Sequence, residues 1–201
     1  MPGPVFHKIL FGIAQFVAPK FGMSEGRHFY EKNRKIEASL PFDIITDQRK
    51  LAGMVYGDTD VGTAGCEAVA IYNILMLERR PRPLSDIIYD LQSSQTLVNR
   101  GKWGTNPFAM KTLLREYDFD FEEIGSVEEA ASKMVPGDKL LVTVWNHSSN
   151  PFKGIHGYVV YMTGEKEYWL LNKNYKSKPE LSSGLEEAIG EGRYIVGYLI
   201  R

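Results

Sequence analysis

The single cysteine, Cys66, is the residue of this sequence best suited to covalent chemistry. It follows the turn-rich segment 57–65 and begins a run of small and apolar residues with helical spacing, which predicts a helix over 66–77. The free amides and positive dipole at a helix N-terminus lower a thiol pKa and favour the nucleophilic thiolate. The same amides can hold the oxyanion formed when a thiolate attacks a carbonyl. Cys66 is therefore a candidate nucleophile, and the alternative is an inert residue packed in a buried helix.

A thiol nucleophile needs an imidazole base, and the imidazole needs a third group that fixes its orientation. His156 begins the apolar segment 156–162 and is the preferred base, whereas its rival His147 lies in a polar loop. Asn172 ends the next apolar segment, and a hairpin turn at 163–166 would return it to the start of the His156 strand. Asn174 is the alternative third member, two positions further along an extended chain.

These residues need a helical part and a sheet to bring them together. Helices are predicted over 5–16, 66–77, 84–91, about 107–117, from residue 126 and over 185–188, and strands over 139–145, 156–162, 168–172 and 194–200. Asn106 can cap one helix with Pro107 in its first turn, and Ser126 begins a capping-box pattern. The order of helices followed by an antiparallel sheet predicts an α+β fold. We expect an N-terminal helical extension over residues 1–45 and a main domain over 46–201.

Composition restricts the classes of function. A net charge of −1 provides no overall field for nucleic acid, and one cysteine excludes an internal disulfide and a multi-cysteine zinc site. Asp58 and Asp60 form only a fragment of a calcium loop, so we expect no metal and no cofactor. The N-terminal apolar stretch is shorter than the roughly 20 residues of a membrane span and lacks the flanks of a secretory signal. These features favour a cytoplasmic protein, with a membrane-surface contact of the N-terminal helix as the minority alternative.

The order Cys, His, Asn, with the cysteine on a helix and the others on a hairpin, resembles the papain-like cysteine peptidase superfamily. Within it, the sequence is most similar to the compact bacterial peptidase C39-like branch. Four segments carry the resemblance: the nucleophile helix from Gly65 to Ala70, the segment 104–107, the histidine strand 156–160 and the last motif 168–172. The resemblance covers about residues 50–201 and implies a papain-like fold with Cys66, His156 and Asn172 as the catalytic residues.

Two positions depart from the family pattern. The family places a glutamine, an oxyanion donor, about six residues before the nucleophile, where this chain has Asp60. An ionised aspartate only accepts hydrogen bonds, so Thr63 or backbone amides near Gly65 would have to replace it. Glu67 stands where the family has a small residue, and its charge would raise the thiol pKa. We expect a cysteine hydrolase of peptide or amide bonds acting on a peptide or protein; the alternative is a degenerate papain-like domain that binds peptides.

Overall fold

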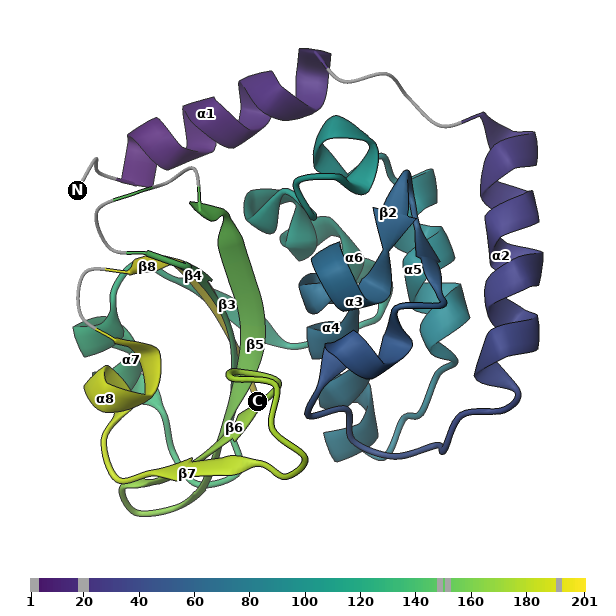
Figure 1. Cartoon of the computed structure of the whole chain (residues 1–201). Coiled ribbons are helices and arrows are strands. Elements are labelled where there is room, and N and C mark those ends of the chain that lie inside the picture. Colours follow the sequence, from purple (N-terminus) through teal and green to yellow (C-terminus); the bar gives the residue numbers. More distant parts are fainter. Residues whose placement is uncertain (1–3, 18–21, 148–149, 151–152, 191–192) are drawn as a thin grey trace.

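The computed structural model describes residues 4–17, 22–147, 150, 153–190 and 193–201. It confirms an α+β fold in which helices and antiparallel sheets are combined (Figure 1). The helices are α1 (Pro4–Val17), α2 (Met23–Glu37), α3 (Val61–Ala64), α4 (Cys66–Leu77), α5 (Leu84–Ser93), α6 (Met110–Glu116), α7 (Val127–Lys133) and α8 (Leu185–Ile189). Short 3₁₀ helices lie at Gln48–Leu51 (η1), Val98–Gly101 (η2) and Pro107–Ala109 (η3). The strands are β1 (Val55–Tyr56), β2 (Thr59–Asp60), β3 (Phe121–Ile124), β4 (Lys139–Trp145), β5 (Ile155–Gly164), β6 (Glu167–Leu171), β7 (Glu180–Ser182) and β8 (Tyr194–Ile200).

Local sequence explains where several helices begin. The side chain of Asn106 accepts a hydrogen bond from the Phe108 amide, with Pro107 in the first turn, as predicted. Ser126 accepts from the amide of Glu129 at the start of α7, and the Glu129 carboxylate accepts from the Gly125 amide. The helix predicted over 66–77 is confirmed with the same bounds, and so are the strands 139–145 and 194–200. These elements position the candidate site.

The main sheet has the strand order β3-β8-β4-β5-β6-β7, and every neighbouring pair is antiparallel. The predicted hairpin of β5 and β6 is present. Figure 1 shows the helices α3 to α6 beside one face of the curled sheet and α7 with α8 beside the other. Side chains alternate between these faces: Leu141 and Val159 belong to the cluster with α4, whereas Val142 and Tyr158 belong to the cluster with α7 and α8.

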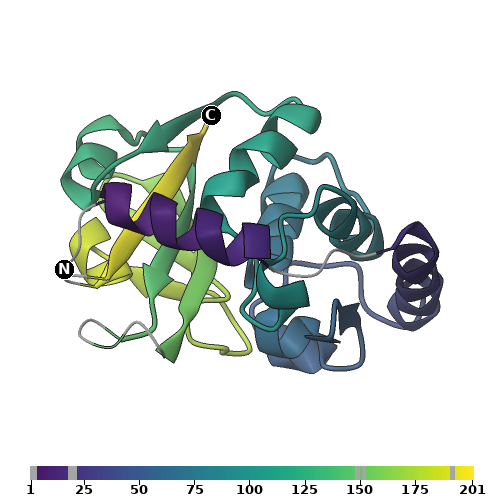
Figure 2. The same cartoon turned by 90° about the horizontal axis from the view of Figure 1, so that it is seen from above.

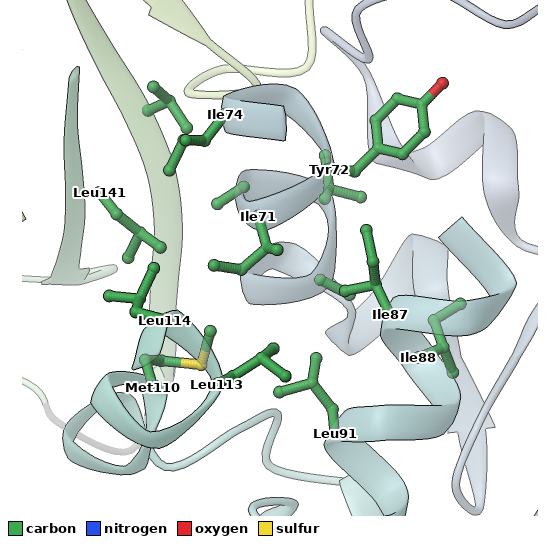
Figure 3. Packing of buried hydrophobic residues seen from close by; sticks show 14 of the residues in the cluster. Ile71, Tyr72, Ile74, Ile87, Ile88, Leu91, Met110, Leu113, Leu114 and Leu141 are labelled. Carbon is green, nitrogen blue, oxygen red and sulfur yellow. The ribbon is translucent and has the colours of Figure 1, made fainter. Parts of the chain in front are cut away.

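Helix α4 lies inside the larger of these two clusters. Ten of its twelve residues, from Cys66 to Leu75, are buried. Figure 3 shows Ile71 and Ile74 of α4 packed among side chains from β4, α5 and α6, with Leu141 on the sheet side. A helix that is apolar around most of its circumference must be buried on most sides. The position of Cys66, the first residue of α4, is therefore fixed by a buried helix.

The described part of the first 45 residues, 4–17 and 22–45, contains the two helices α1 and α2. Helix α1 crosses the outside of the sheet and helical part (Figure 2), where His7 and Phe11 pack against the Trp145 ring. The polar segment 24–35 forms most of α2, which packs against α5. Ile9 and Ile13 remain exposed on α1. Across the described ranges, none of the helices combines the length and apolar character required to cross a bilayer.

Candidate active site

Cys66 is the first residue of α4, but its thiol is not activated. Its side chain is buried, with 4% of the residue exposed, and Sγ donates a hydrogen bond to Oε2 of Glu67 at 2.8 Å. Burial raises the pKa of the Cys66 thiol well above its ordinary value, and the charge and hydrogen bond of Glu67 act in the same direction. The backbone N–H groups of Gly157 and Glu67 oppose this rise without reversing it. The lowered pKa expected from the helix N-terminus is therefore not found.

Glu67 is a fully buried carboxyl group. Its exposed fraction is 0%, and burial raises its pKa from 4.5 to about 7, although the hydrogen bond from Cys66 acts to lower it. Oε2 accepts from the thiol, whereas Oε1 has no hydrogen-bond partner among the described residues. A buried carboxyl with one unpaired oxygen is costly in its ionised form. At neutral pH the group is therefore close to the midpoint of its titration.

Two glycines from different layers border the Glu67 carboxyl, and the absence of a side chain at Gly157 makes room for it. A Cβ on Gly157 in β5 would lie 3.0 Å from Oε1, which is closer than side chains normally approach. A Cβ on Gly104, in the loop before η3, would lie 4.0 Å from Oε2. Gly104 has φ +75°, a left-handed conformation that favours glycine. The carboxyl thus occupies the junction between the helical part and the sheet.

His156 is buried at the start of β5 and is held by carbonyl oxygens. Its Nε2 lies 2.6 Å from the main-chain oxygen of Asn172. Because a carbonyl only accepts hydrogen bonds, Nε2 carries the proton of the neutral ring and Nδ1 is its acceptor. Burial lowers the pKa of His156, and hydrogen bonds to the backbone of Asn172 and Lys173 partly offset this. The imidazole is therefore held in its neutral form.

The His156 ring packs between two tyrosines, with its centroid 5.8 Å from that of Tyr158 and 5.3 Å from that of Tyr175. Strand alternation places His156 on the face shared with Tyr158, whereas the next residue, Gly157, faces α4. Within the described part of the chain, no hydrogen bond joins the Cys66 sulfur to the His156 ring. Cys66 therefore approaches β5 at Gly157, whereas the His156 ring lies on the opposite face of the strand, and the two side chains are not paired.

Asn172 lies next to His156, as the hairpin predicted, but its side chain has a different partner. The Asn172 amide donates to Oε1 of Gln48 at 2.7 Å, and its oxygen accepts from the Gln48 backbone amide at 3.0 Å. The Gln48 amide group in turn donates to the carbonyls of Val61 and Gly62. Gln48 connects the end of β6 to α3, and the sequence contains no motif that could have identified it. Asn174, the alternative, donates to Glu180 and is exposed.

Asp60 and Thr63, which were expected near an oxyanion, instead form the N-terminal cap of helix α3. The Asp60 carboxylate accepts from the backbone amide of Thr63 at 2.9 Å and from its hydroxyl at 3.0 Å. Gly65 allows α3 and α4 to meet, because a Cβ there would lie 2.8 Å from the Cα of Val61. The rival base His147 lies in the loop after β4, whose residues 148–149 and 151–152 are outside the described part. In the part of the chain that the structure describes, the side-chain hydrogen bonds of Asp60 and Thr63 join these two residues to each other and do not reach Cys66.

The arrangement is a buried thiol–carboxyl pair beside a neutral imidazole. Three features disfavour a thiolate–imidazolium pair. The pKa of the Cys66 thiol is raised, the thiol donates a hydrogen bond to the Glu67 carboxyl, and the pKa of His156 is lowered. In the described ranges, the structure holds no group of three or more His, Cys, Asp or Glu side chains that could bind a metal ion. The site as folded favours the protonated thiol.

Comparison with protein-family models finds no family that matches this chain, and comparison with curated proteins finds no matching relative. The resemblance of the sequence to papain-like peptidases therefore stays a prediction.

Proposed function

We propose that the chain is a papain-like domain that acts as a peptide-binding or interaction module instead of a thiol hydrolase at neutral pH. One observation carries the proposal: the thiol of Cys66, the position that resembles the nucleophile, donates a hydrogen bond to the buried carboxyl of Glu67. A hydrolase of this type needs a thiolate beside its base. Here burial and the Glu67 charge both raise the thiol pKa, so little thiolate forms near pH 7.

A papain-like architecture is supported by the placement of the elements. Cys66 begins a buried helix, His156 is the second residue of the strand that packs on this helix, and Asn172 directly follows the neighbouring strand. The order and spacing of these three residues are those on which the sequence resemblance rests. We therefore propose a papain-like architecture without thiol hydrolase activity at neutral pH.

The binding role is supported by the surface beside the site. Trp103 precedes Gly104, whose backbone lies next to Ala64 and Glu67, and 64% of the tryptophan is exposed. Tryptophan is enriched among the residues that dominate the binding energy of protein interfaces. A chain segment bound over this loop would contact an aromatic surface without approaching the buried sulfur. We expect the ligand to be an extended peptide.

Fluorescein-labelled unfolded casein is a suitable probe, because fluorescence polarisation reports both binding and cleavage. We expect polarisation to rise on addition of the protein and to stay constant over hours, to the same extent with wild type and Cys66→Ser. Trp103→Ala should reduce the rise. A time-dependent fall in polarisation that needs Cys66 would refute the proposal in favour of hydrolysis. A probe that is neither bound nor cleaved would also contradict it.

Hydrolysis is the second candidate function, and two observations favour it. The backbone amides of Gly157 and Glu67 act to lower the thiol pKa, as donors to a thiolate would. In addition, the neutral His156 ring carries its proton on Nε2, which leaves Nδ1 to accept a proton. The rate of Cys66 alkylation by iodoacetamide, measured against pH, separates the two functions. A thiol pKa below the ordinary range in wild type, raised in His156→Ala, would establish the hydrolase.

A further inference from the structure

The Glu67 side chain is completely enclosed by the protein. It is buried among residues of three segments: Cys66 on α4, Gly157 on β5 and Gly104 in the loop before η3. Gly157 lacks the Cβ that would crowd the carboxyl, whereas a Cβ on Gly104 would make only an ordinary contact with it. Shape complementarity of this kind around a charged group indicates that the carboxyl itself has a role, because an apolar side chain would fill the same space without a desolvation cost.

The two carboxyl oxygens of Glu67 differ in their surroundings. Oε2 accepts a hydrogen bond from the Cys66 thiol, with 2.8 Å between Oε2 and Sγ. Oε1 is a buried atom beside Gly157 that has no hydrogen-bond partner among the described residues. Thr143 pairs with Gly157 across β4 and β5, and its hydroxyl is likewise buried and unpaired in the described structure. Opposed residues share one face of a sheet, so Thr143 and Glu67 both border the space at Gly157. This polar pair is enclosed beside the only thiol of the chain.

We infer that Glu67 is a positioning residue that holds Cys66 as a neutral thiol, and that its carboxyl is a built-in suppressor of nucleophilic chemistry at this site. The inference rests on the proposed function. In physical terms, a carboxylate accepts a hydrogen bond from the protonated thiol and repels the negative charge that deprotonation would create. When the carboxyl is removed, the hydrogen bonds from the backbone amides of Gly157 and Glu67 to the sulfur remain. Both of these favour the thiolate.

The single cysteine makes a direct measurement possible. In protein labelled with ¹³C at the cysteine Cβ, one resonance reports the protonation of Cys66 across a pH titration. We expect the thiol pKa to be at least one lower in Glu67→Gln and Glu67→Ala than in wild type, with about tenfold faster alkylation by iodoacetamide at pH 8. Glu186→Gln, which removes an exposed carboxylate on α8, should titrate like wild type.

Chemical rescue separates the carboxyl from simple packing. Glu67→Ala should open a cavity of about the size of a small carboxylate, and added formate should restore slow alkylation and the high thiol pKa. Formamide, a neutral molecule of similar size, should not. If the role of Glu67 were only structural, neither formate nor formamide would change the alkylation rate or the thiol pKa of Glu67→Ala. Wild type provides an additional measurement that needs no variant: the same resonance should shift with a midpoint near pH 7 as Glu67 titrates.

The outcomes distinguish this inference from the proposed function. If wild type has a high thiol pKa that Glu67→Gln leaves unchanged, and the wild-type resonance does not move near pH 7, the inference is wrong and the proposed function stands. If the wild-type thiol is already deprotonated near pH 6 and depends on His156, the proposed function is wrong. If either Glu67 variant fails to fold, as judged by circular dichroism, the wild-type titration alone decides the inference.

Discussion

The contact between Gly157 and Glu67 yields a prediction with a magnitude. A Cβ at position 157 would lie 3.0 Å from Oε1, 3.1 Å from Cδ and 3.3 Å from Cγ of Glu67, whereas ordinary contacts begin at 3.4 Å. Three atoms of one buried side chain would thus have to move, and α4 leaves them little space. Overpacking of this kind costs roughly 1–3 kcal/mol. We therefore expect Gly157→Ala to lower the free energy of unfolding by about that amount.

The cause is tested by a double-mutant cycle with Glu67→Ala, which removes all three of the crowded atoms. In that background a Cβ at position 157 meets no Glu67 atom beyond Cβ, so Gly157→Ala should cost less than about 0.5 kcal/mol. The difference from the wild-type background, roughly 1–2 kcal/mol, is the coupling between the two positions. Urea unfolding followed by tryptophan fluorescence measures each free energy.

Gly184→Ala is the matched control, because a Cβ at position 184 meets no atom within 4 Å. It should change the free energy of unfolding by no more than about 0.5 kcal/mol. The reasoning is refuted if Gly157→Ala behaves like this control, or if the effects of Gly157→Ala and Glu67→Ala are additive. Either result would mean that the carboxyl does not occupy the space beside Gly157.

Two further predictions concern pH and the third site residue. A carboxyl whose pKa rises from 4.5 to about 7 on folding binds its proton more tightly in the folded state, so its contribution to stability is present below pH 4.5 and is lost as pH rises through 7. The difference in unfolding free energy between wild type and Glu67→Gln should therefore fall by roughly 3 kcal/mol between pH 4 and 8; a constant difference would contradict the raised pKa. Asn172→Gly suits the left-handed backbone at φ 66° and removes both side-chain bonds to Gln48, which should cost roughly 1–3 kcal/mol in urea unfolding. The pKa of His156 by NMR should stay within about 0.5 of wild type, because His156 bonds to the main chain of Asn172, and a larger change would show that the side chain orients the ring.

Elements with a strong pattern could be predicted from the sequence. The bounds of α4 follow from its apolar spacing, from Gly65 before it and from the cations at Arg79 and Arg80 after it. Strands β3 and β7 were not predicted. They are short edge strands, and the segment Phe121–Ile124 contains two glutamates, so it forms a strand because β8 provides hydrogen-bond partners. Tertiary pairing of this kind leaves no local signal.

In the candidate site, too, some contacts could be predicted from the sequence and others depend on tertiary structure. The adjacency of His156 and Asn172 followed from the hairpin, because strand lengths and a turn determine which residues lie side by side. The partner of the Cys66 thiol could not be predicted in this way. Adjacent residues on a helix point in different directions, so a bond from Cys66 to Glu67 is not expected from spacing. It depends on Gly157 in a distant strand, which encloses the carboxyl beside the sulfur.

The missing side chain at position 157 has a consequence for how this sequence can vary. A carboxylate at position 67 and any Cβ at position 157 compete for the same volume, although the two positions lie far apart along the chain. Divergence at one of them is therefore open only to chains that have already changed the other, or that change both together. In descendants or ancestors of this chain, glycine at 157 should accompany glutamate at 67, and small residues at 67 should accompany larger ones at 157.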